Sequence, residues 1–312
     1  MDERQKAELL RIAAGRVEFN SPMSQRTTFR VGGNADAFYE ASNMEGLCRV
    51  LPYLVREEIP YLVIGRGSNL LVRDGGIRGV VIFLSGAHAE IDRKKSGGPE
   101  ITVGAGLSIA DLLRWCREAG MSGLEFLAGI PGTVGGAVAM NAGAFGNEIG
   151  SRVREIRLVT PGGERMAIDR SRLAFSYRAL DLKKGAVITR VGFRLDREDG
   201  KTVSEKITGY VRKRKETQPL EYPSAGSVFK NPPNDYAGRL IEQAGLKGKK
   251  LGRAMISNRH ANFIVNEGGA TAVDILALID TAREAVRKTT GVTLEIEIQV
   301  VGDPVPGKEE QS

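Results

Sequence analysis

Residues 126–146 constrain the fold of this chain most, because these 21 residues include six glycines and five alanines. Residues this small lower helix and strand propensity and bury little side-chain surface. Apolar residues such as Ile130, Val134 and Val138 are interspersed among them, whereas flexible glycine-rich linkers are polar. We therefore interpret the segment as backbone that approaches a flat or phosphorylated ligand closely, in preference to a flexible loop.

A second glycine-rich segment, Gly65-Arg66-Gly67-Ser68-Asn69, lies between two short apolar stretches at residues 61–64 and 70–72. Successive backbone amides in such a turn can converge on an anion, and Ser and Asn side chains add donors. The third glycine and the following helix of a dinucleotide-binding fingerprint are missing, which argues against a Rossmann fold. Taken alone, the segment fits a plain hairpin turn and an anion-binding turn equally well.

The net charge of +7 is compatible with three kinds of partner: nucleic acid, an anionic membrane surface and phosphorylated small molecules. The most basic stretch, residues 212–215, lies on a predicted helix at residues 203–215 and lacks interleaved aromatic residues. Aromatic residues make up only 6% of the chain. Proteins that bind single strands stack bases on aromatic side chains, so this composition argues against nucleic acid as the partner.

Cysteine and histidine are too few to indicate a metal site. Cys48 and Cys116 lack CxxC spacing, and His88 and His260 are the two histidines of the chain, so neither a disulfide framework nor a zinc site is predicted. No run approaches the ~18 apolar residues that span a bilayer, and the N-terminus lacks a basic region followed by an apolar one. We expect a protein of the reducing cytoplasm with no membrane partner.

Apolar periodicity and capping residues predict a mixture of helices and strands without regular βαβ repetition, which favours the α+β class. Ser108 and Thr271 are predicted helix N-caps, and Gly120 and Gly291 are predicted stops. The predicted helices cover residues 6–14, 108–119, 203–215, 236–244 and 271–289, and the predicted strands cover residues 61–64, 70–72, 80–84, 153–159, 187–195 and 293–301.

The last predicted strand alternates apolar and polar residues, which places Glu295, Glu297 and Gln299 on one face. Two acids on such a face are commonly just its solvated side. If the face lines a cavity, however, desolvation raises the pKa of a carboxyl group and makes it a usable acid. Ser227 is in no Gly-x-Ser-x-Gly motif, so a hydrolase nucleophile is not predicted.

Six segments, taken in order, resemble one family of bacterial flavoenzymes, the UDP-N-acetylenolpyruvoylglucosamine reductases. The similarity extends over about residues 24–302. The segments are residues 27–33 (TTFRVGG), 65–72 (GRGSNLLV), 130–136 with 141–146 (IPGTVGG and NAGAFG), 175–178 (FSYR), 225–232 (AGSVFKNP) and 294–297 (LEIE).

The resemblance implies an α+β fold with a two-lobed FAD-binding domain of the vanillyl-alcohol-oxidase (PCMH) type and a smaller α+β substrate-binding domain. We place the FAD-binding region at residues 1–197, with lobes at about 1–86 and 87–197. The polar residues 196–200 mark the boundary, so the substrate-binding domain covers residues 198–303, and residues 304–312 form a disordered tail.

The resemblance also implies a reaction. With FAD as cofactor and NADPH as hydride donor, the family reduces the enolpyruvyl ether of UDP-N-acetylglucosamine-enolpyruvate to UDP-N-acetylmuramate. This product is a precursor of peptidoglycan, so the expected roles are cell-wall biogenesis, cell shape and cell division.

Site residues follow from matching positions. Arg178 and Glu297 are expected to stabilise the negative charge that develops on the substrate, and Ser227 is expected to donate a proton. The expected substrate-binding residues are Tyr177, Arg214, Lys230 and Asn231. The expected cofactor-binding residues are Gly65, Arg66, Gly67, Ser68, Asn69, Gly129, Pro131, Gly132, Thr133, Gly135, Gly136, Asn141, Ala142 and Gly143.

The stretch between Arg178 and Ser227 is too short for the extra segment of longer family members, in which a tyrosine folds over the substrate. The chain therefore resembles the shorter subclass without this tyrosine lid. Two other functions stay open at this point: a flavin oxidase of related fold that acts on a small alcohol, and a basic nucleic-acid binder. Many such oxidases tether FAD through a histidine, and no histidine lies within the glycine motifs.

Overall fold

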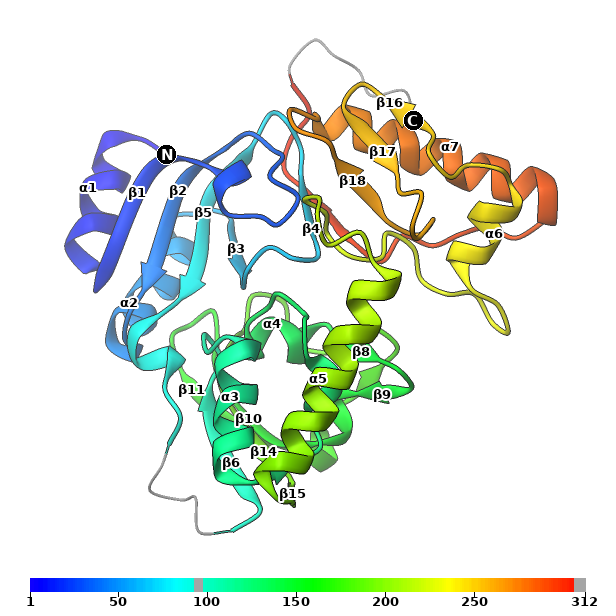
Figure 1. The fold of residues 1–312 in the computed structure, drawn as a ribbon. Helices are drawn as coiled ribbons and strands as arrows, with labels where there is room; N and C mark the ends of the chain where they lie inside the picture. The colour runs from blue at the N-terminus through cyan, green and yellow to red at the C-terminus, as the bar shows by residue number, and fades with distance from the viewer. Residues whose placement is uncertain (93–97, 306–312) are drawn as a thin grey trace. The chain divides into compact units, whose positions relative to one another are not determined.

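The computed structural model describes residues 1–92 and 98–305, and the chain forms two compact units (Figure 1). The first unit comprises Met1–Phe19, Ala37–Arg66 and Gly79–Arg212. The second comprises Asn20–Asp36, Gly67–Arg78 and the chain from Lys213 onward. Each unit has its own buried apolar cluster. Within the described ranges, no helix is both long enough and apolar enough to cross a bilayer.

A four-stranded sheet of order β1-β2-β5-β3 begins the fold. Strands β3 and β5 are parallel, with Tyr61 opposite Val80. Leu9 of helix α1 and Leu51 of helix α2 pack in the same buried cluster as Ile82 of β5, so both helices cover this sheet. The bounds are α1 Glu3–Ile12, β1 Gly15–Pro22, β2 Asn34–Ala41, α2 Met44–Arg56, β3 Tyr61–Ile64 and β5 Ile77–Leu84.

The first unit also contains an antiparallel sheet of order β11-β10-β14-β6. In its centre Ile156 of β10 lies opposite Val191 of β14, and Val191 lies opposite Val103 of β6. The predicted strands at residues 153–159 and 187–195 are confirmed, the second ending at Arg194. The bounds are β6 Glu100–Gly104, β10 Val153–Val159, β11 Arg165–Asp169 and β14 Val187–Arg194.

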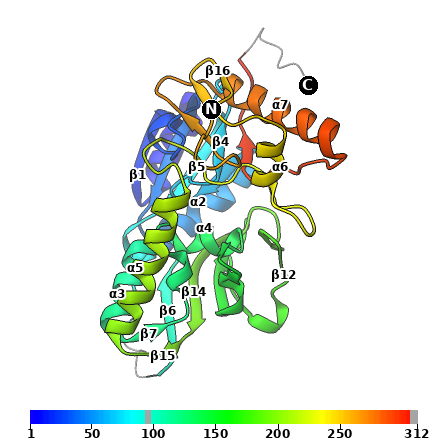
Figure 2. The ribbon, with the colours of Figure 1, turned by 45° about the vertical axis from the view of Figure 1, so that its right-hand side comes forward.

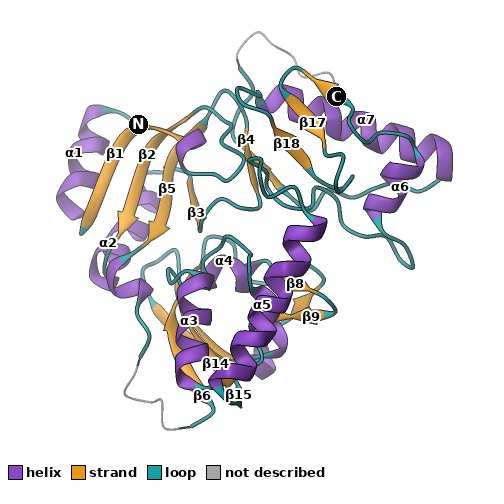
Figure 3. Ribbon diagram, viewed as in Figure 1, coloured by secondary structure: helices purple, strands orange, loops and turns teal. Residues whose placement is uncertain are grey.

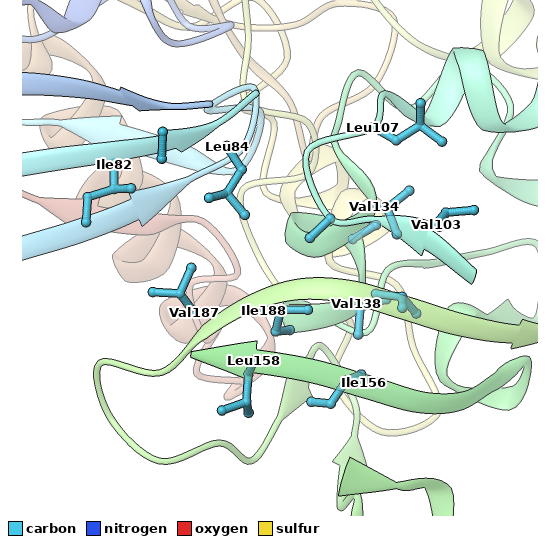
Figure 4. Close-up of a cluster of buried hydrophobic side chains, with 14 of the residues drawn as sticks. Ile82, Leu84, Val103, Leu107, Val134, Val138, Ile156, Leu158, Val187 and Ile188 are labelled. Carbon is cyan, nitrogen blue, oxygen red and sulfur yellow. The ribbon is translucent and has the colours of Figure 1, made fainter. Parts of the chain in front are cut away.

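Part of the small-residue segment forms a helix against this sheet. Helix α4 (Val134–Ala139) points Val134 and Val138 into the buried cluster beside Ile156 and Ile188 (Figure 4). A Cβ atom at Gly135 would lie only 2.8 Å from the Cβ of Ala105. Close packing of the chain on itself therefore explains this glycine, where the sequence suggested approach to a ligand.

Helices α3 and α5 lie side by side in the first unit in both views (Figures 1 and 2). The predicted caps of α3 are confirmed, because the Ser108 side chain accepts from the amide of Asp111 and Gly120 ends the helix at φ +62°. The bounds are α3 Ile109–Ala119, β7 Met121–Ser122, β8 Gly143–Ala144, β9 Asn147–Glu148, β12 Phe175–Ser176, β13 Ala179–Leu180, β15 Asp196–Arg197 and α5 Gly200–Thr217.

The polar residues 196–200, which were predicted as a domain boundary, belong to the first unit and pair with it. Strand β15 pairs with β7, and the amide of Glu198 donates to the carbonyl of Gly120. The compact units divide later, between Arg212 and Lys213 within α5, and the second unit also takes in two N-terminal segments. The functional division at residues 197/198 stays a prediction.

The second unit combines a small antiparallel sheet, β16-β17-β18, with two helices and a parallel strand pair, β4 and β19 (Figure 3). Ile256 of β17 packs in one cluster with Ile241 of α6 and Leu278 of α7. The predicted N-cap of α7, Thr271, is confirmed, and it forms a capping box with Asp274. The bounds are β4 Leu70–Val72, α6 Ala237–Gln243, β16 Lys250–Leu251, β17 Ala254–Ile256, β18 Ile264–Asn266, α7 Ala272–Thr290 and β19 Gln299–Val301.

The predicted last strand, residues 293–301, is wrong in its extent, because only its last three residues form a strand. Ile296 makes an isolated bridge to Phe229, whereas Gln299 pairs with Leu70 of β4. The segment thus pairs first with Phe229 and then with β4. Neither partner is long enough to pair with all of residues 293–301 as one strand. Of the predicted tail, residues 306–312 lie outside the described residues.

His88 is a buried titratable group of the first unit. Its side chain is 3% exposed, and among the described residues its Nε2 has no hydrogen-bond partner. Burial lowers the pKa of His88, outweighing a hydrogen bond with the backbone of Asn43. In the unfolded chain the imidazole takes up a proton near pH 6.5, so between that pH and its lower folded pKa the unfolded state binds more protons.

We therefore expect the free energy of unfolding to fall as the pH drops below about 6.5, and His88→Gln to reduce this fall by up to about 1 kcal/mol at one unit below that pH. Urea denaturation of wild type and variant at neutral and mildly acidic pH measures the difference. An equal loss of stability in both proteins would contradict the expectation.

Candidate active site

Two of the predicted cofactor segments lie against each other in the first unit. Strand β3 ends at Ile64, and a Cβ atom on the next residue, Gly65, would lie 2.5 Å from the Oγ1 of Thr133. The Thr133 side chain also accepts from the amide of Gly136 at the start of α4. The residues before α4, Gly129, Pro131 and Gly132, are exposed or half-buried in the loop that leads to Thr133.

Several backbone amides of these segments have no acceptor among the described residues. Over residues 1–92 and 98–305, the amides of Gly65, Arg66, Gly132 and Thr133 donate no hydrogen bond to another protein group. Backbone amides beside glycines that are not used by described protein groups can converge on an anionic ligand. These donors fit the phosphates of a dinucleotide cofactor.

The remaining residues of the first glycine turn belong to the second unit. A Cβ atom on Gly67, which has φ +60°, would lie 2.7 Å from the carbonyl oxygen of Arg26. The amides of Gly67 and Ser68 also donate no hydrogen bond among the described residues. The Asn69 side chain donates to the carbonyl of Glu297 at 3.1 Å, which links this turn to the segment of a candidate catalytic residue.

Arg178 occupies the two-residue turn of the β12–β13 hairpin with Tyr177. Its φ of +59° is unusual for a residue with a side chain, and such backbone strain is concentrated at functional sites. Its guanidinium carbon lies 4.7 Å from the centroid of the Tyr177 ring. A Cβ atom at Gly143 would lie 2.9 Å from Nη1 of Arg178, so the β8–β9 hairpin lies beside this turn.

Asn141 holds the two hairpins together from within the core. Its side chain is fully buried, and Nδ2 donates to the Glu148 carboxylate and to the Ser176 carbonyl, both at 2.9 Å. Its Oδ1 accepts from the amide of Gly150. Ala142, which follows it, donates its amide to Ala137 of α4. The Asn141 carboxamide thus bonds to protein groups next to both hairpins.

Ser227 and Glu297 are brought together in the second unit. The amide of Glu297 donates to the carbonyl of Val228 at 2.8 Å, and Phe229 bridges Ile296. Both Ser227 and Glu297 are half-buried. The Ser227 hydroxyl makes no hydrogen bond to another described residue, which leaves it available to a ligand. Arg178 belongs to the first unit.

The predicted substrate-binding residues of the second unit have different surroundings. Lys230 forms an ion pair with Glu295 at 3.2 Å, and the Asn231 side chain accepts from the amide of Ala237 at the start of α6. Arg214 is 8% exposed, and burial lowers the pKa of its guanidinium, whereas its neighbours Lys213 and Lys215 are exposed.

Sequence reasoning missed Asn262, whose side chain pairs with the main chain of Phe229, two residues after Ser227. The residue lies in no motif that we singled out. Its role depends on a partner 33 positions away in the sequence, which no local pattern indicates.

The chain matches two protein-family models. Residues 35–169 match an FAD binding domain, and residues 218–301 match the C-terminal domain of UDP-N-acetylenolpyruvoylglucosamine reductase. The two matches follow each other along the chain in the order predicted for the cofactor and substrate domains.

Curated proteins and a solved structure are similar over nearly the whole chain. The UDP-N-acetylenolpyruvoylglucosamine reductase of Geobacter metallireducens is 44% identical over 304 residues, which covers 97% of this chain and all of the relative. That of Anoxybacillus flavithermus is 43% identical, covering 96% and 99%. The crystal structure of UDP-N-acetylenolpyruvylglucosamine reductase from Thermus caldophilus is 39% identical with a TM-score of 0.80, covering 92% of this chain and 99% of that chain. The α+β class with an FAD-binding domain is confirmed.

The role of Asn141 can be tested by a single-atom exchange. In Asn141→Asp, a carboxylate oxygen would face the Glu148 carboxylate and the Ser176 carbonyl in place of an N–H donor. We expect the free energy of unfolding to fall by about 3 kcal/mol, measured by urea denaturation.

Asn147→Asp is the matched control, because this asparagine lies in the β8–β9 hairpin that Asn141 contacts but is exposed, and its side chain donates only to the carbonyl of Phe145. Its stability should change by less than about 1 kcal/mol. Similar losses in the two variants would show that Asn141 does not hold the hairpins.

Proposed function

Since the chain belongs to the UDP-N-acetylenolpyruvoylglucosamine reductase family, we propose that the segments described above hold its cofactor and that Arg178, Ser227 and Glu297 act on its substrate. The similarity that carries this conclusion extends over both domains and covers all of the Geobacter relative. The roles of individual residues are the proposal.

The protein is an FAD-dependent oxidoreductase of peptidoglycan precursor synthesis. It uses NADPH to reduce the enolpyruvyl ether of UDP-N-acetylglucosamine-enolpyruvate to UDP-N-acetylmuramate. Its small-molecule partners are therefore a UDP sugar and NADPH. We propose the cytoplasm as its location.

The amides of Gly65, Arg66, Gly132 and Thr133 are proposed to bind the phosphates of FAD. These four amides donate to no acceptor in the part of the chain that the structure describes, so they can offer hydrogen bonds to an anion. Bound FAD supplies the hydride transfer from NADPH to the substrate. The close contact of Gly65 with Thr133 sets the spacing between the two groups of donors.

Arg178 and Glu297 are proposed to stabilise the charge that develops on the substrate. Addition of hydride to the vinyl group leaves negative charge that extends to the adjacent carboxylate. A guanidinium offers a forked pair of donors to a carboxylate, and the fixed turn of Arg178 limits its conformational freedom. Glu297 can donate a hydrogen bond to that charge only as the protonated acid.

Ser227 is proposed to donate the proton that completes the reduction. A serine hydroxyl is a weak acid in water, but a carbanion-like centre needs only a well-positioned O–H donor. The absence of a hydrogen-bond partner for this hydroxyl among the described residues supports the assignment, because no protein group competes for its proton.

Arg214 is proposed to bind the diphosphate of the UDP moiety. Its buried guanidinium is costly to desolvate, and an anionic ligand would offset that cost by bidentate hydrogen bonding. Tyr177, Lys230 and Asn231 are proposed as further substrate contacts, and they are exposed or half-buried.

The two half-reactions test the function. We expect NADPH to bleach the visible flavin absorbance of the purified protein, and the UDP-enolpyruvyl sugar to restore it without oxygen. Ser227→Ala should keep the rate of bleaching while restoration by the sugar slows by roughly 100-fold or more. Stopped-flow absorbance measures both rates.

Failure of the wild-type protein to be reoxidised by the sugar would overturn the proposed function. Equal slowing of both half-reactions in Ser227→Ala would instead show that Ser227 has a structural role.

Arg214→Ala should mainly raise the KM for the UDP sugar, by 10-fold or more, because the variant loses a charge-assisted contact to a phosphate. Steady-state kinetics with varied sugar concentration measures this effect. Lys213→Ala removes an exposed charge from the adjacent position and serves as the control. An unchanged KM in Arg214→Ala would remove this residue from the diphosphate site.

A further inference from the structure

Asn262 makes three hydrogen bonds to the main chain that follows Ser227. Its Oδ1 accepts from the amide of Phe229 at 2.9 Å, and its Nδ2 donates to the carbonyl of the same residue at 2.8 Å. Its own carbonyl accepts from the amide of Val228 at 2.8 Å. The carboxamide therefore pairs with Phe229 as a residue of an adjacent β-strand would.

The opposite edge of the same segment is bound by the Glu297 region. The carbonyl of Val228 accepts from the amide of Glu297, and the amide of Lys230 donates to the carbonyl of Glu295. All hydrogen-bonding groups of the Val228 and Phe229 main chain thus have partners. Those partners come from Asn262 on one side and the Glu297 region on the other.

Ser227 itself makes few contacts that would fix its position. It follows Gly226, which has φ +75° and no neighbour within 4 Å of where a Cβ atom would be. Neither its main chain nor its hydroxyl hydrogen-bonds to another described residue. The position of Ser227 therefore depends on its anchored neighbours. Val228 and Phe229 follow it, and before Gly226 the chain is held by buried Ala225 and by the hydroxyl of Thr28, which donates to the carbonyl of Ser224 at 2.7 Å.

We infer that Asn262 is a positioning residue for the proton donor: its buried carboxamide fixes the main chain after Ser227 beside Glu297. The inference rests on the proposed function of Ser227. A displacement of about 1 Å at a reacting group can cost about 100-fold in rate, so a residue that never touches the substrate can control this step.

The main chain of Asn262 is itself supported by His260. The amide of Asn262 donates to Nδ1 of His260 at 3.2 Å, and the imidazole packs edge-on against the ring of Phe263 with centroids 5.0 Å apart. This acceptor role requires an unprotonated Nδ1. Burial lowers the pKa of His260, with Lys247 acting in the same direction and Glu242 opposing it, so the acceptor persists into mildly acidic solution.

Two variants distinguish a role of Asn262 in positioning Ser227 from a role in folding alone. Asn262→Leu removes both hydrogen bonds to Phe229, whereas Asn262→Asp loses the donor when ionised and regains an O–H donor when protonated. Asn266 provides the matched control. It is equally buried at 3% exposure, and its carboxamide also bonds only to main-chain groups, those of Phe29, Gly268 and Ala270.

The experiment measures the two half-reactions of the FAD-loaded protein by stopped-flow absorbance. In both Asn262 variants we expect bleaching by NADPH within about 2-fold of wild type and reoxidation by the UDP-enolpyruvyl sugar slowed by roughly 10-fold or more. In Asn262→Asp, reoxidation relative to wild type at the same pH should recover as the pH falls, because the protonated acid restores the donor. Asn266→Asp should not show this selective, pH-reversible loss.

Three outcomes would overturn the inference: equal slowing of both half-reactions, a loss no larger than that of Asn266→Asp, or no recovery of Asn262→Asp at low pH. If Asn262→Leu does not fold, the pH series of Asn262→Asp decides alone. Failure of the wild-type protein to be reoxidised by the sugar would instead count against the proposed function, so the two failures are distinguishable.

Discussion

The candidate catalytic segments depend on buried asparagine side chains that replace main-chain hydrogen-bond partners. Arg178 lies on the turn of a two-stranded hairpin, and Ser227 lies two residues before an isolated bridge, so neither segment belongs to one of the larger sheets. Buried backbone groups require partners, and a carboxamide offers a donor and an acceptor in peptide-like geometry. Asn141 serves the Arg178 hairpin in this way, and Asn262 serves the Ser227 segment.

The unpaired amides of the glycine segments contrast with the main chain of Val228 and Phe229, whose hydrogen-bonding groups all have partners. The chain uses side chains to satisfy irregular backbone near Ser227 and Arg178, yet the amides of Gly65, Arg66, Gly132 and Thr133 have no protein acceptor among the described residues. The same physical requirement applies in both places. In the first case the partner is an asparagine, and in the second case the proposed partner is the phosphate group of FAD.

The glycines of these segments are required for more than one physical reason. Positions 65 and 135 require glycine because protein atoms lie where a side chain would be. Next to Gly65 this atom is Oγ1 of Thr133, and next to Gly135 it is the Cβ of Ala105. Gly67 combines such a contact with a left-handed backbone. The high glycine content therefore correctly predicted that another group lies close to the backbone. At these positions, however, that group is another part of the protein.

Features that depend on neighbouring residues were predicted correctly from the amino-acid sequence. These include the Ser108 and Thr271 caps, the short strand before Gly65, and the motifs that identify the reductase family. The sequence indicated which residues form the candidate site. It did not indicate which protein groups those residues contact, because these contacts depend on the fold. Two features became visible only in the folded chain: residues 293–301 change pairing partner after Ile296, and Asn262 pairs with Phe229. Capping and periodicity act over a few residues, whereas these hydrogen bonds join segments whose proximity exists only after the chain has packed its core.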